Sequence, residues 1–479
     1  MYTQLLTRTL LIAMATMILA GCAVSTPAPT QPTQPAATTA PTAASPAATQ
    51  PVATKAPEPT KTTVSTSAPA PTTAAATAMP VKILFVGNSY TYARVAPALQ
   101  YNTANVQDLT KSFNDVAPAA GSFPIGSGTL PNPCATPDVG CYNPHPWGGV
   151  PGIFKKMTDQ VGLRYEVAIS ARGAATLRGH FLNTASSDWN LRGNLASQKW
   201  DVVVLQGQSD EPLPPARSKN GNPIAWRTYL DKLIEYVHLG IALTTTETQI
   251  FGGLERCTAA PTAATPGPGL TTTSCNTSRT IPANANANPG AKIYLYQTWA
   301  RPDMVEPHKC IDADNSTVDG RPKLDPTCNK GADGNAATGE NNVFYTSRAT
   351  TAENLADMTA DLRAAFKAAS TANSRVTGVV PVGDAFQLAV DQKVVKTSNF
   401  YNAAGVYDNS GTLMDLWWLD RTHASVHGSY LAALTMFAKI TGIDPTTLGG
   451  DEVAAKELGI SKNDAIPLQR IARDAVLAK

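Results

Sequence analysis

Five short runs of apolar and β-branched residues recur along the chain between residues 81 and 382. They are residues 81–86, 165–169, 201–205, 292–296 and 376–382. Short apolar runs that are bounded by turn-forming residues predict β-strands. Because the apolar residues are nearly continuous rather than alternating, both faces of each strand should be covered, as they are in a parallel sheet.

Helical patterns of apolar residues lie between or after some of these runs. The clearest are residues 226–238, 351–369 and 424–440. Strands that alternate with helices along one domain favour an open α/β/α sandwich. We therefore predict three layers built around a parallel sheet of five strands.

The N-terminal segment predicts export. Residues 1–21 consist of a short charged start, an apolar stretch of about ten residues and small residues before Cys22. An apolar stretch of this length is too short for a transmembrane helix. The end of the segment, Leu19-Ala20-Gly21-Cys22, resembles the bacterial lipobox, which implies cleavage before Cys22 and lipidation of its thiol. A structural cysteine is the alternative. We expect an exported lipoprotein of the cell envelope, held by lipid at the outer side of the cytoplasmic membrane or at the outer membrane.

A tether should follow the anchor. Residues 22–78 are almost entirely Ala, Thr, Pro, Ser and Gln, so they have few apolar side chains to offset the entropy cost of ordering. The folded domain then spans residues 79–479. The chain carries 38 basic and 36 acidic residues, a formal net charge of +2, so charge offers no argument for a nucleic-acid partner.

Six cysteines remain besides Cys22, all of them in stretches rich in Gly, Pro, Asn and Thr. These stretches, at about residues 105–150, 257–289 and 302–342, are predicted to be long surface insertions. An even number of cysteines in an exported protein favours disulfides, although six cysteines allow 15 pairings. Local order suggests the pairs Cys134–Cys141, Cys257–Cys275 and Cys310–Cys328.

Three polar residues suggest nucleophilic catalysis. Ser89 follows the first predicted strand in Gly87-Asn88-Ser89, so its hydroxyl should lie at the carboxyl end of the sheet, where open α/β folds bind ligands. Asp420 and His423 stand three residues apart near the last predicted helix. A serine nucleophile, a histidine base and a carboxylate that orients the histidine are the set used in acyl transfer.

Two alternatives compete for the same C-terminal residues. Asp420 precedes a predicted helix and is a candidate for its N-cap. His427 stands one helical turn beyond His423, so Asp420, His423 and His427 also form a possible metal-ligand set. We prefer the catalytic hypothesis, because a helical metal site leaves Ser89 unexplained, and we expect no metal and no cofactor.

Two segments offer donors for an oxyanion. Gly173 follows the second predicted strand, and Gln206 and Gln208 follow the third. An ordinary turn is the alternative for the glycine. Aromatic residues near the predicted loops either stack on a sugar ring or pack in the core. They are Tyr90, Tyr92, Trp147, Trp299, Trp417 and Trp418.

Taken in order, Gly87-Asn88-Ser89, Gly173, Gln206-Gly207-Gln208-Ser209-Asp210 and Asp420-Arg421-Thr422-His423 resemble the four blocks of SGNH (GDSL-type) hydrolases. The resemblance implies an SGNH or flavodoxin-like sandwich and an oxyanion hole from Ser89, Gly173 and Gln206, with Gln208 as the second choice. Two departures stand out: Asn88 replaces the usual Asp, and the third block lacks the usual Asn. Its Gln-Gly-x-Ser is closer to sialate and xylan O-acetylesterases.

The resulting hypothesis is a membrane-anchored serine esterase. It would remove small acyl groups, O-acetyl above all, from a carbohydrate or envelope glycan, or act on a small ester. A non-catalytic glycan-binding protein on the same scaffold is the rival. A metal-dependent phosphodiesterase is a more distant alternative, since few other carboxylates stand near Asp420 in the sequence.

Overall fold

The computed structural model describes residues 79–110, 145–182, 190–305, 343–398, 400, 411–418 and 420–477, and the backbone of short strands between 308 and 330. The chain divides into Met1–Ala74 and the compact unit Ala75–Lys479. The predicted signal, Cys22 and the whole of the predicted tether lie outside the described residues. In the part that the structure describes, no helix is both long and apolar enough to cross a bilayer.

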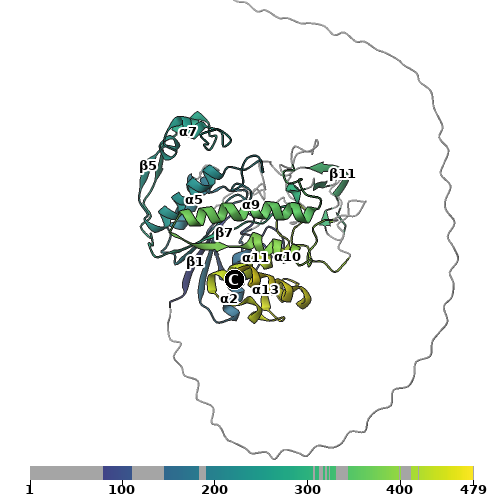
Figure 1. The fold of residues 1–479 in the computed structure, drawn as a ribbon. Coiled ribbons are helices and arrows are strands. Elements are labelled where there is room, and N and C mark those ends of the chain that lie inside the picture. The colour runs from purple at the N-terminus through teal and green to yellow at the C-terminus, as the bar shows by residue number, and fades with distance from the viewer. Residues whose placement is uncertain are drawn as a thin grey trace, which may run out of the picture. The chain divides into compact units, whose positions relative to one another are not determined.

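A six-stranded parallel sheet forms the centre of the compact unit (Figure 1). Its order is β12-β7-β4-β1-β3-β2. The strands are β1 (Val81–Gly87), β2 (Val106–Asp108), β3 (Tyr165–Ala171), β4 (Val202–Leu205), β7 (Lys292–Tyr296) and β12 (Val376–Val380). All five predicted strands are present, but the predicted number was wrong. The sixth, β2, has only three residues at an edge, too few to make an apolar run.

The order of the five predicted strands decides where a site can form. They run β3-β1-β4-β7-β12, which is the doubly wound order 2-1-3-4-5 when they are counted along the chain. The chain leaves β1 toward one edge and returns to add β4 on the other side. The carboxyl ends of β1 and β4 are therefore the switch point, and there Val86 pairs with Leu205. In folds of this kind the ligand binds at such a point.

Both faces of the sheet are covered, which explains the continuous apolar runs. Along β1, Ile83 and Phe85 belong to one buried cluster, while Leu84 and Val86 belong to another. The first cluster includes residues of α2 (Gly149–Gln160), α10 (Val382–Asp391), α11 (Val426–Thr441) and α13 (Lys462–Leu477). The second includes residues of α3 (Leu177–Leu182) and α5 (Pro223–His238). The predicted three layers are thus present.

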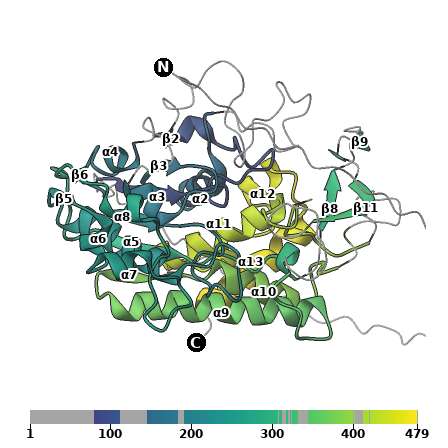
Figure 2. The same ribbon diagram turned by 90° about the horizontal axis from the view of Figure 1, so that it is seen from above.

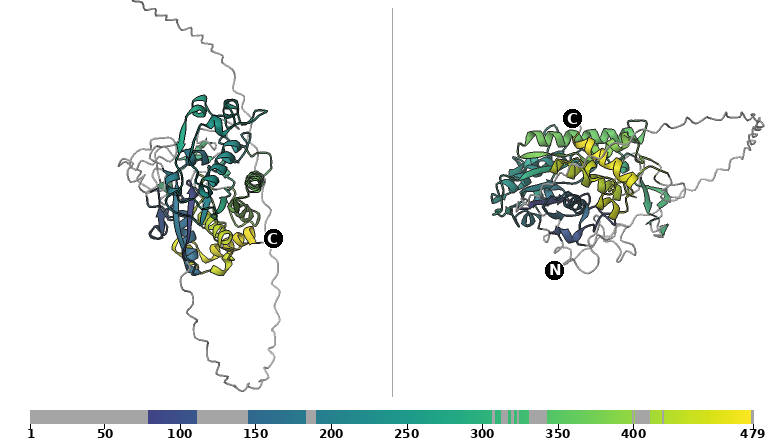
Figure 3. Two further views of the ribbon diagram at one scale, coloured as in Figure 1. Left: turned by 90° about the vertical axis from the view of Figure 1, so that its left-hand side faces the viewer. Right: turned by 90° about the horizontal axis from the view of Figure 1, so that it is seen from below.

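Figures 2 and 3 show the C-terminal helices, in yellow, packed together with α10 and α2. Helix α9 (Thr351–Ala372) runs beside β12 and contributes to both clusters, through Leu355 and Met358 on one side and Phe366 on the other. The predicted helices correspond to α5, α9 and α11, with ends shifted by up to three residues.

Shorter elements connect this framework. They are α4 (Leu191–Leu195), β5 (Leu243–Thr245), α6 (Glu247–Ile250), α7 (Leu254–Thr258), α8 (Thr272–Asn276), β6 (Arg279–Ile281), β8 (His308–Ile311), β9 (Thr317–Val318), β10 (Arg321–Pro322), β11 (Leu324–Lys330) and α12 (Val453–Glu457), with 3-10 turns at Thr103–Asn105, Pro302–Met304 and Pro445–Leu448. The pairs β5 with β6, β8 with β11 and β9 with β10 are antiparallel.

One of the three predicted disulfides is present in the described residues. Cys257 on α7 and Cys275 on α8 are bonded across 18 residues. Both cysteines are fully buried. A closed loop of this length stabilises the fold by about 3 kcal/mol in the chain-entropy model. Cys134 and Cys141 lie outside the described residues, and so do the side chains of Cys310 and Cys328.

Candidate active site

Ser89 lies in a tight turn that begins where β1 ends. A Cβ atom at Gly87 would lie 2.0 Å from Thr91 Oγ1 and 2.6 Å from Gln206 Oε1, so only glycine allows the chain to pass here. After Gly87 the backbone turns back at once, because the N–H groups of Thr91 and Tyr92 both donate to the carbonyl oxygen of Asn88. The turn leaves the side chain of Ser89 largely buried at the switch point of the sheet.

Asp420 and His423 belong to one turn just before α11. Asp420 Oδ1 accepts hydrogen bonds from the backbone N–H groups of Thr422 and His423, at 3.0 and 2.9 Å. Its Oδ2 lies 2.5 Å from His423 Nδ1. The N-cap of α11 is Ser425, whose side chain accepts from the Gly428 N–H. The alternative that Asp420 caps this helix is therefore wrong.

The two segments meet at the histidine. His423 Nε2 lies 2.7 Å from Ser89 Oγ, while Nδ1 of the same ring faces Asp420. A proton on Nδ1 is held by the carboxylate, which leaves Nε2 as the acceptor for the serine hydroxyl proton. Residues more than 300 positions apart thus form a continuous chain of two hydrogen bonds.

Burial and neighbouring charges both act on this pair. Burial tends to raise the pKa of the Asp420 carboxyl, but His423 and Arg94 together lower it well below its usual range. Burial lowers the pKa of the His423 imidazole, and Arg94 adds to that effect while Asp420 opposes it. At neutral pH the imidazole is therefore uncharged and able to accept a proton.

Arg94 is a site residue that sequence reasoning missed. Its Nη1 lies 3.6 Å from Asp420 Oδ2 and 3.4 Å from His423 Nδ1, and its guanidinium lies over the ring of Trp418. Because His423 Nδ1 donates to Asp420, the arginine pairs with the carboxylate rather than with the ring. The only sequence signal was a basic residue five positions after Ser89, on the same loop.

Arg94→Met is expected to shift the acidic limb of the kcat/KM profile to higher pH by about 0.5–1 unit, the effect of one charge at this distance in a solvent-like medium. The sign follows from the catalytic hypothesis, in which His423 is a base that works only when neutral, because loss of a nearby positive charge raises the pKa of its imidazole. A pH series with a soluble ester measures the limb. Arg227→Met on α5 removes an equal charge whose partners are Asp231 and the carbonyl oxygen of Ala368, and it should leave the limb in place. A limb that does not move in Arg94→Met would contradict this account.

A buried set of side chains supports the turn from behind. The carbonyl oxygen of Thr422 accepts from Tyr90 Oη at 2.8 Å and from Trp299 Nε1 at 3.0 Å, and the two rings are stacked with centroids 3.9 Å apart. Arg301 Nη2 lies 3.4 Å from Thr422 Oγ1 and 2.6 Å from Asp303. Both aromatic residues are buried, so they fix the turn that carries Asp420 and His423 and present no face to a sugar.

Gln206, the first choice for an oxyanion amide, is not at the surface of the site. It is fully buried, and its Oε1 accepts from the Asn88 N–H at 2.8 Å and from Thr91 Oγ1 at 3.0 Å. Its Nε2 donates to the carbonyl oxygen of Gly207. Its Oε1 thus holds the Ser89 turn against the end of β4, and its Nε2 already has an acceptor, so the geometry does not favour Gln206 as the oxyanion amide.

Gln208 has a different environment. It is half-buried, and its Oε1 lies 3.4 Å from Asn88 Nδ2. Among the described residues, the backbone N–H groups of Ser89 and Gly173 and the Gln208 Nε2 donate to no protein acceptor. These three groups come from the loops after β1, β3 and β4, whose ends are neighbours in the sheet.

The metal alternative finds no support in this geometry. His427 lies in the first turn of α11 with Nε2 3.5 Å from Asp464 Oδ2 on α13. His423 instead faces Asp420 through Nδ1 and Ser89 through Nε2. Within the described ranges, no group of three or more His, Cys, Asp and Glu side chains is arranged to hold a metal ion.

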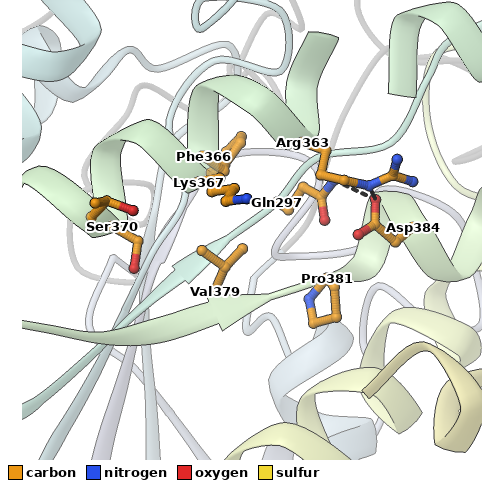
Figure 4. A pocket seen from close by; sticks show the side chains of 9 residues that line it. Gln297, Arg363, Phe366, Lys367, Ser370, Val379, Pro381 and Asp384 are labelled. Atoms are coloured by element: carbon orange, nitrogen blue, oxygen red, sulfur yellow. Dashed lines mark hydrogen bonds and ion pairs between the residues drawn. The ribbon is translucent and has the colours of Figure 1, made fainter. Parts of the chain in front are cut away.

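A surface pocket lies apart from the triad of Ser89, His423 and Asp420, between α9 and the end of β12 (Figure 4). Its polar wall is made by Asp384, which accepts from Gln297 Nε2 at 2.8 Å and from Arg363 Nε at 2.9 Å. No residue of the triad lines it. This pocket therefore provides no support for the catalytic hypothesis.

Fold and site together define an α/β protein with a doubly wound parallel sheet and a Ser-His-Asp constellation at its switch point. The chain matches no protein-family model, and no curated protein matches it. Among solved structures it is similar to a candidate SGNH hydrolase from Slackia heliotrinireducens, with 15% identity over 75% of this chain and 98% of that one and a TM-score of 0.30. It is also similar to a DUF4886 family protein from Bacteroides uniformis, with 12% identity over 83% and 95% and a TM-score of 0.35. Because both TM-scores are low, these two structures carry no argument about the function of this chain.

Proposed function

We propose that the protein is a serine esterase whose nucleophile is Ser89. The observation that supports this most is the continuous contact from Asp420 through His423 to Ser89, with distances of 2.5 and 2.7 Å. A buried serine, a neutral imidazole and an ionised carboxylate in this order are the groups that nucleophilic acyl transfer requires.

In the proposed reaction, Ser89 Oγ attacks the ester carbonyl carbon while His423 Nε2 takes the hydroxyl proton. The tetrahedral intermediate then breaks its bond to the alkoxy oxygen, which leaves as an alcohol with the proton from Nε2. Water attacks the acyl-serine in the same way and gives a proton to Nε2. The acid is released when Ser89 Oγ recovers that proton.

The negative oxygen of each intermediate needs fixed donors. We assign this role to the N–H groups of Ser89 and Gly173 and to Nε2 of Gln208. In the described part of the chain these groups donate to no protein acceptor. Gln208 thereby takes the place that the sequence had offered first to Gln206.

We further propose that the acyl group is small, O-acetyl in particular, and that it is carried by a carbohydrate. This step rests on the resemblance of Gln206-Gly207-Gln208-Ser209 to the carbohydrate O-acetylesterase pattern. The rival function, glycan binding without catalysis, would leave no reason to keep Ser89, His423 and Asp420 in hydrogen-bond contact.

The full-length protein should hydrolyse p-nitrophenyl acetate and release acetate from at least one acetylated polysaccharide. A fluorophosphonate probe should label Ser89 and stop both reactions. Binding to a polysaccharide with neither hydrolysis nor labelling would instead favour the binding protein.

The lipid anchor is a proposal of its own. Cys22→Ser is expected to move the protein out of the membrane fraction, because the thiol that would carry the lipid is gone. Fractionation of cells that express each form measures this, with Cys22→Ser and wild type compared for esterase activity in both fractions. If the variant still requires detergent, the attachment lies elsewhere.

A further inference from the structure

The side chain of Asn88 is buried between three loops. Its Oδ1 accepts from the Tyr90 N–H at 3.1 Å. Its Nδ2 lies 3.0 Å from the carbonyl oxygen of Gly207, and 3.4 Å from both Gln208 Oε1 and the carbonyl oxygen of Ala175. Only 1% of its surface is exposed. A single carboxamide therefore joins the turn after β1 to the loops after β3 and β4.

The surroundings determine which end of the carboxamide points where. One end faces an N–H donor and the other faces three oxygen atoms, so the first must be the oxygen and the second the NH₂ group. A carboxylate at this position would meet three oxygen atoms with no proton to offer. The buried environment would make that mismatch costly.

The three loops that Asn88 joins are those that carry the proposed oxyanion donors. Ser89 is the next residue, Gly173 precedes Ala175 by two positions, and Gln208 is in direct contact. Because Gln208 Oε1 faces Asn88, the NH₂ end of that side chain is turned away from Asn88. Asn88 thus acts on each donor without touching the reacting atoms.

We propose that Asn88 is a positioning residue that sets the geometry of the oxyanion hole, with Gln208 as the side-chain donor that it orients. The inference rests on the proposed esterase function. It gives one physical reason for both departures from the hydrolase motif: the amide at position 88 and the longer amide at position 208 form a matched donor and acceptor pair.

The test is Asn88→Asp in the full-length protein, assayed on p-nitrophenyl acetate. At neutral pH, kcat should fall on the order of 10²-fold, with KM within about threefold, as expected for a donor that acts mainly in the transition state. The ratio of mutant to wild-type kcat/KM should rise as pH falls from about 8 to 5, because a protonated carboxyl regains a donor for the Gly207 oxygen.

Other titrating groups face the same region. They are His423, across Ser89, and Glu211, which lies beside Gly207 and whose pKa burial raises to about 8. Both are present in wild type and variant, so the ratio cancels the titration that the two proteins have in common. A negative charge at position 88 would raise the pKa of His423 and lower the ratio at acidic pH, which is opposite to the rise expected here. A fall in kcat with a ratio that stays flat across pH would mean that Asn88 only supports the fold, and would overturn the inference.

Gln208→Glu is the second variant, and it decides the question even when Asn88→Asp does not fold. Gln208 is half-buried, and a glutamate keeps an oxygen toward Asn88 while it replaces the donor with a carboxylate. We expect a loss in kcat on the order of 10²–10³-fold with unchanged thermal unfolding. Wild-type kcat in this variant would overturn the inference. Absence of hydrolysis and of fluorophosphonate labelling in the wild-type protein would overturn the esterase function itself.

Discussion

Replacement of Ser89 by alanine is expected to reduce kcat for ester hydrolysis by about 10⁴–10⁶-fold. The reaction needs the Oγ atom as the attacking group, and no other hydroxyl contacts His423 Nε2 among the described residues. The fold should survive, because Ser89 Oγ makes a single hydrogen bond whose loss costs about 1 kcal/mol.

The measurement is kcat on p-nitrophenyl acetate, together with thermal unfolding of each protein. Ser429→Ala is the matched control: this serine is also buried, and its Oγ makes a hydrogen bond to the carbonyl oxygen of Ser425. The control should lose stability and keep its activity. If Ser89→Ala retains more than a few per cent of wild-type kcat, Ser89 is not the nucleophile.

Replacement of His423 by alanine should have an effect of similar size. Without the imidazole, the proton of Ser89 has no acceptor, so nucleophile and base fail as one unit. The double variant Ser89→Ala/His423→Ala should therefore be no less active than either single variant. Asp420 keeps partners after the change, since its Oδ1 still accepts from two backbone N–H groups and Arg94 lies near its Oδ2.

His427→Ala provides the matched control for this prediction. It removes the same side chain one helical turn further on, where Nε2 faces Asp464 instead of the nucleophile. Activity close to that of wild type is expected, and a chelator should change nothing. If His427→Ala were as inactive as His423→Ala and a chelator abolished hydrolysis, the metal alternative would replace the serine mechanism.

The sequence by itself determined the elements whose signal is local. The five apolar runs predicted five parallel strands because residues on both sides of each strand are buried, as Leu84 and Phe85 are. The strand β2 was not predicted, because its three residues at the edge of the sheet are too few to form an apolar run. Ser89, Asp420 and His423 were also predictable, since a strand that ends at glycine and a carboxylate three residues before a histidine are short-range patterns.

Only the tertiary structure decided which neighbours these residues acquire. Arg94 became a partner of Asp420 because the turn after β1 meets a turn more than 300 residues away. Gln206 and Gln208 look equivalent in the sequence, but β4 ends at Leu205, so Gln206 is the first residue after the strand and Gln208 lies further along the loop. The register of β4 buries Gln206 against the Asn88 N–H and leaves Gln208 half-buried beside the Asn88 side chain. Such contacts depend on strand order and on the direction of each side chain, which no local pattern contains.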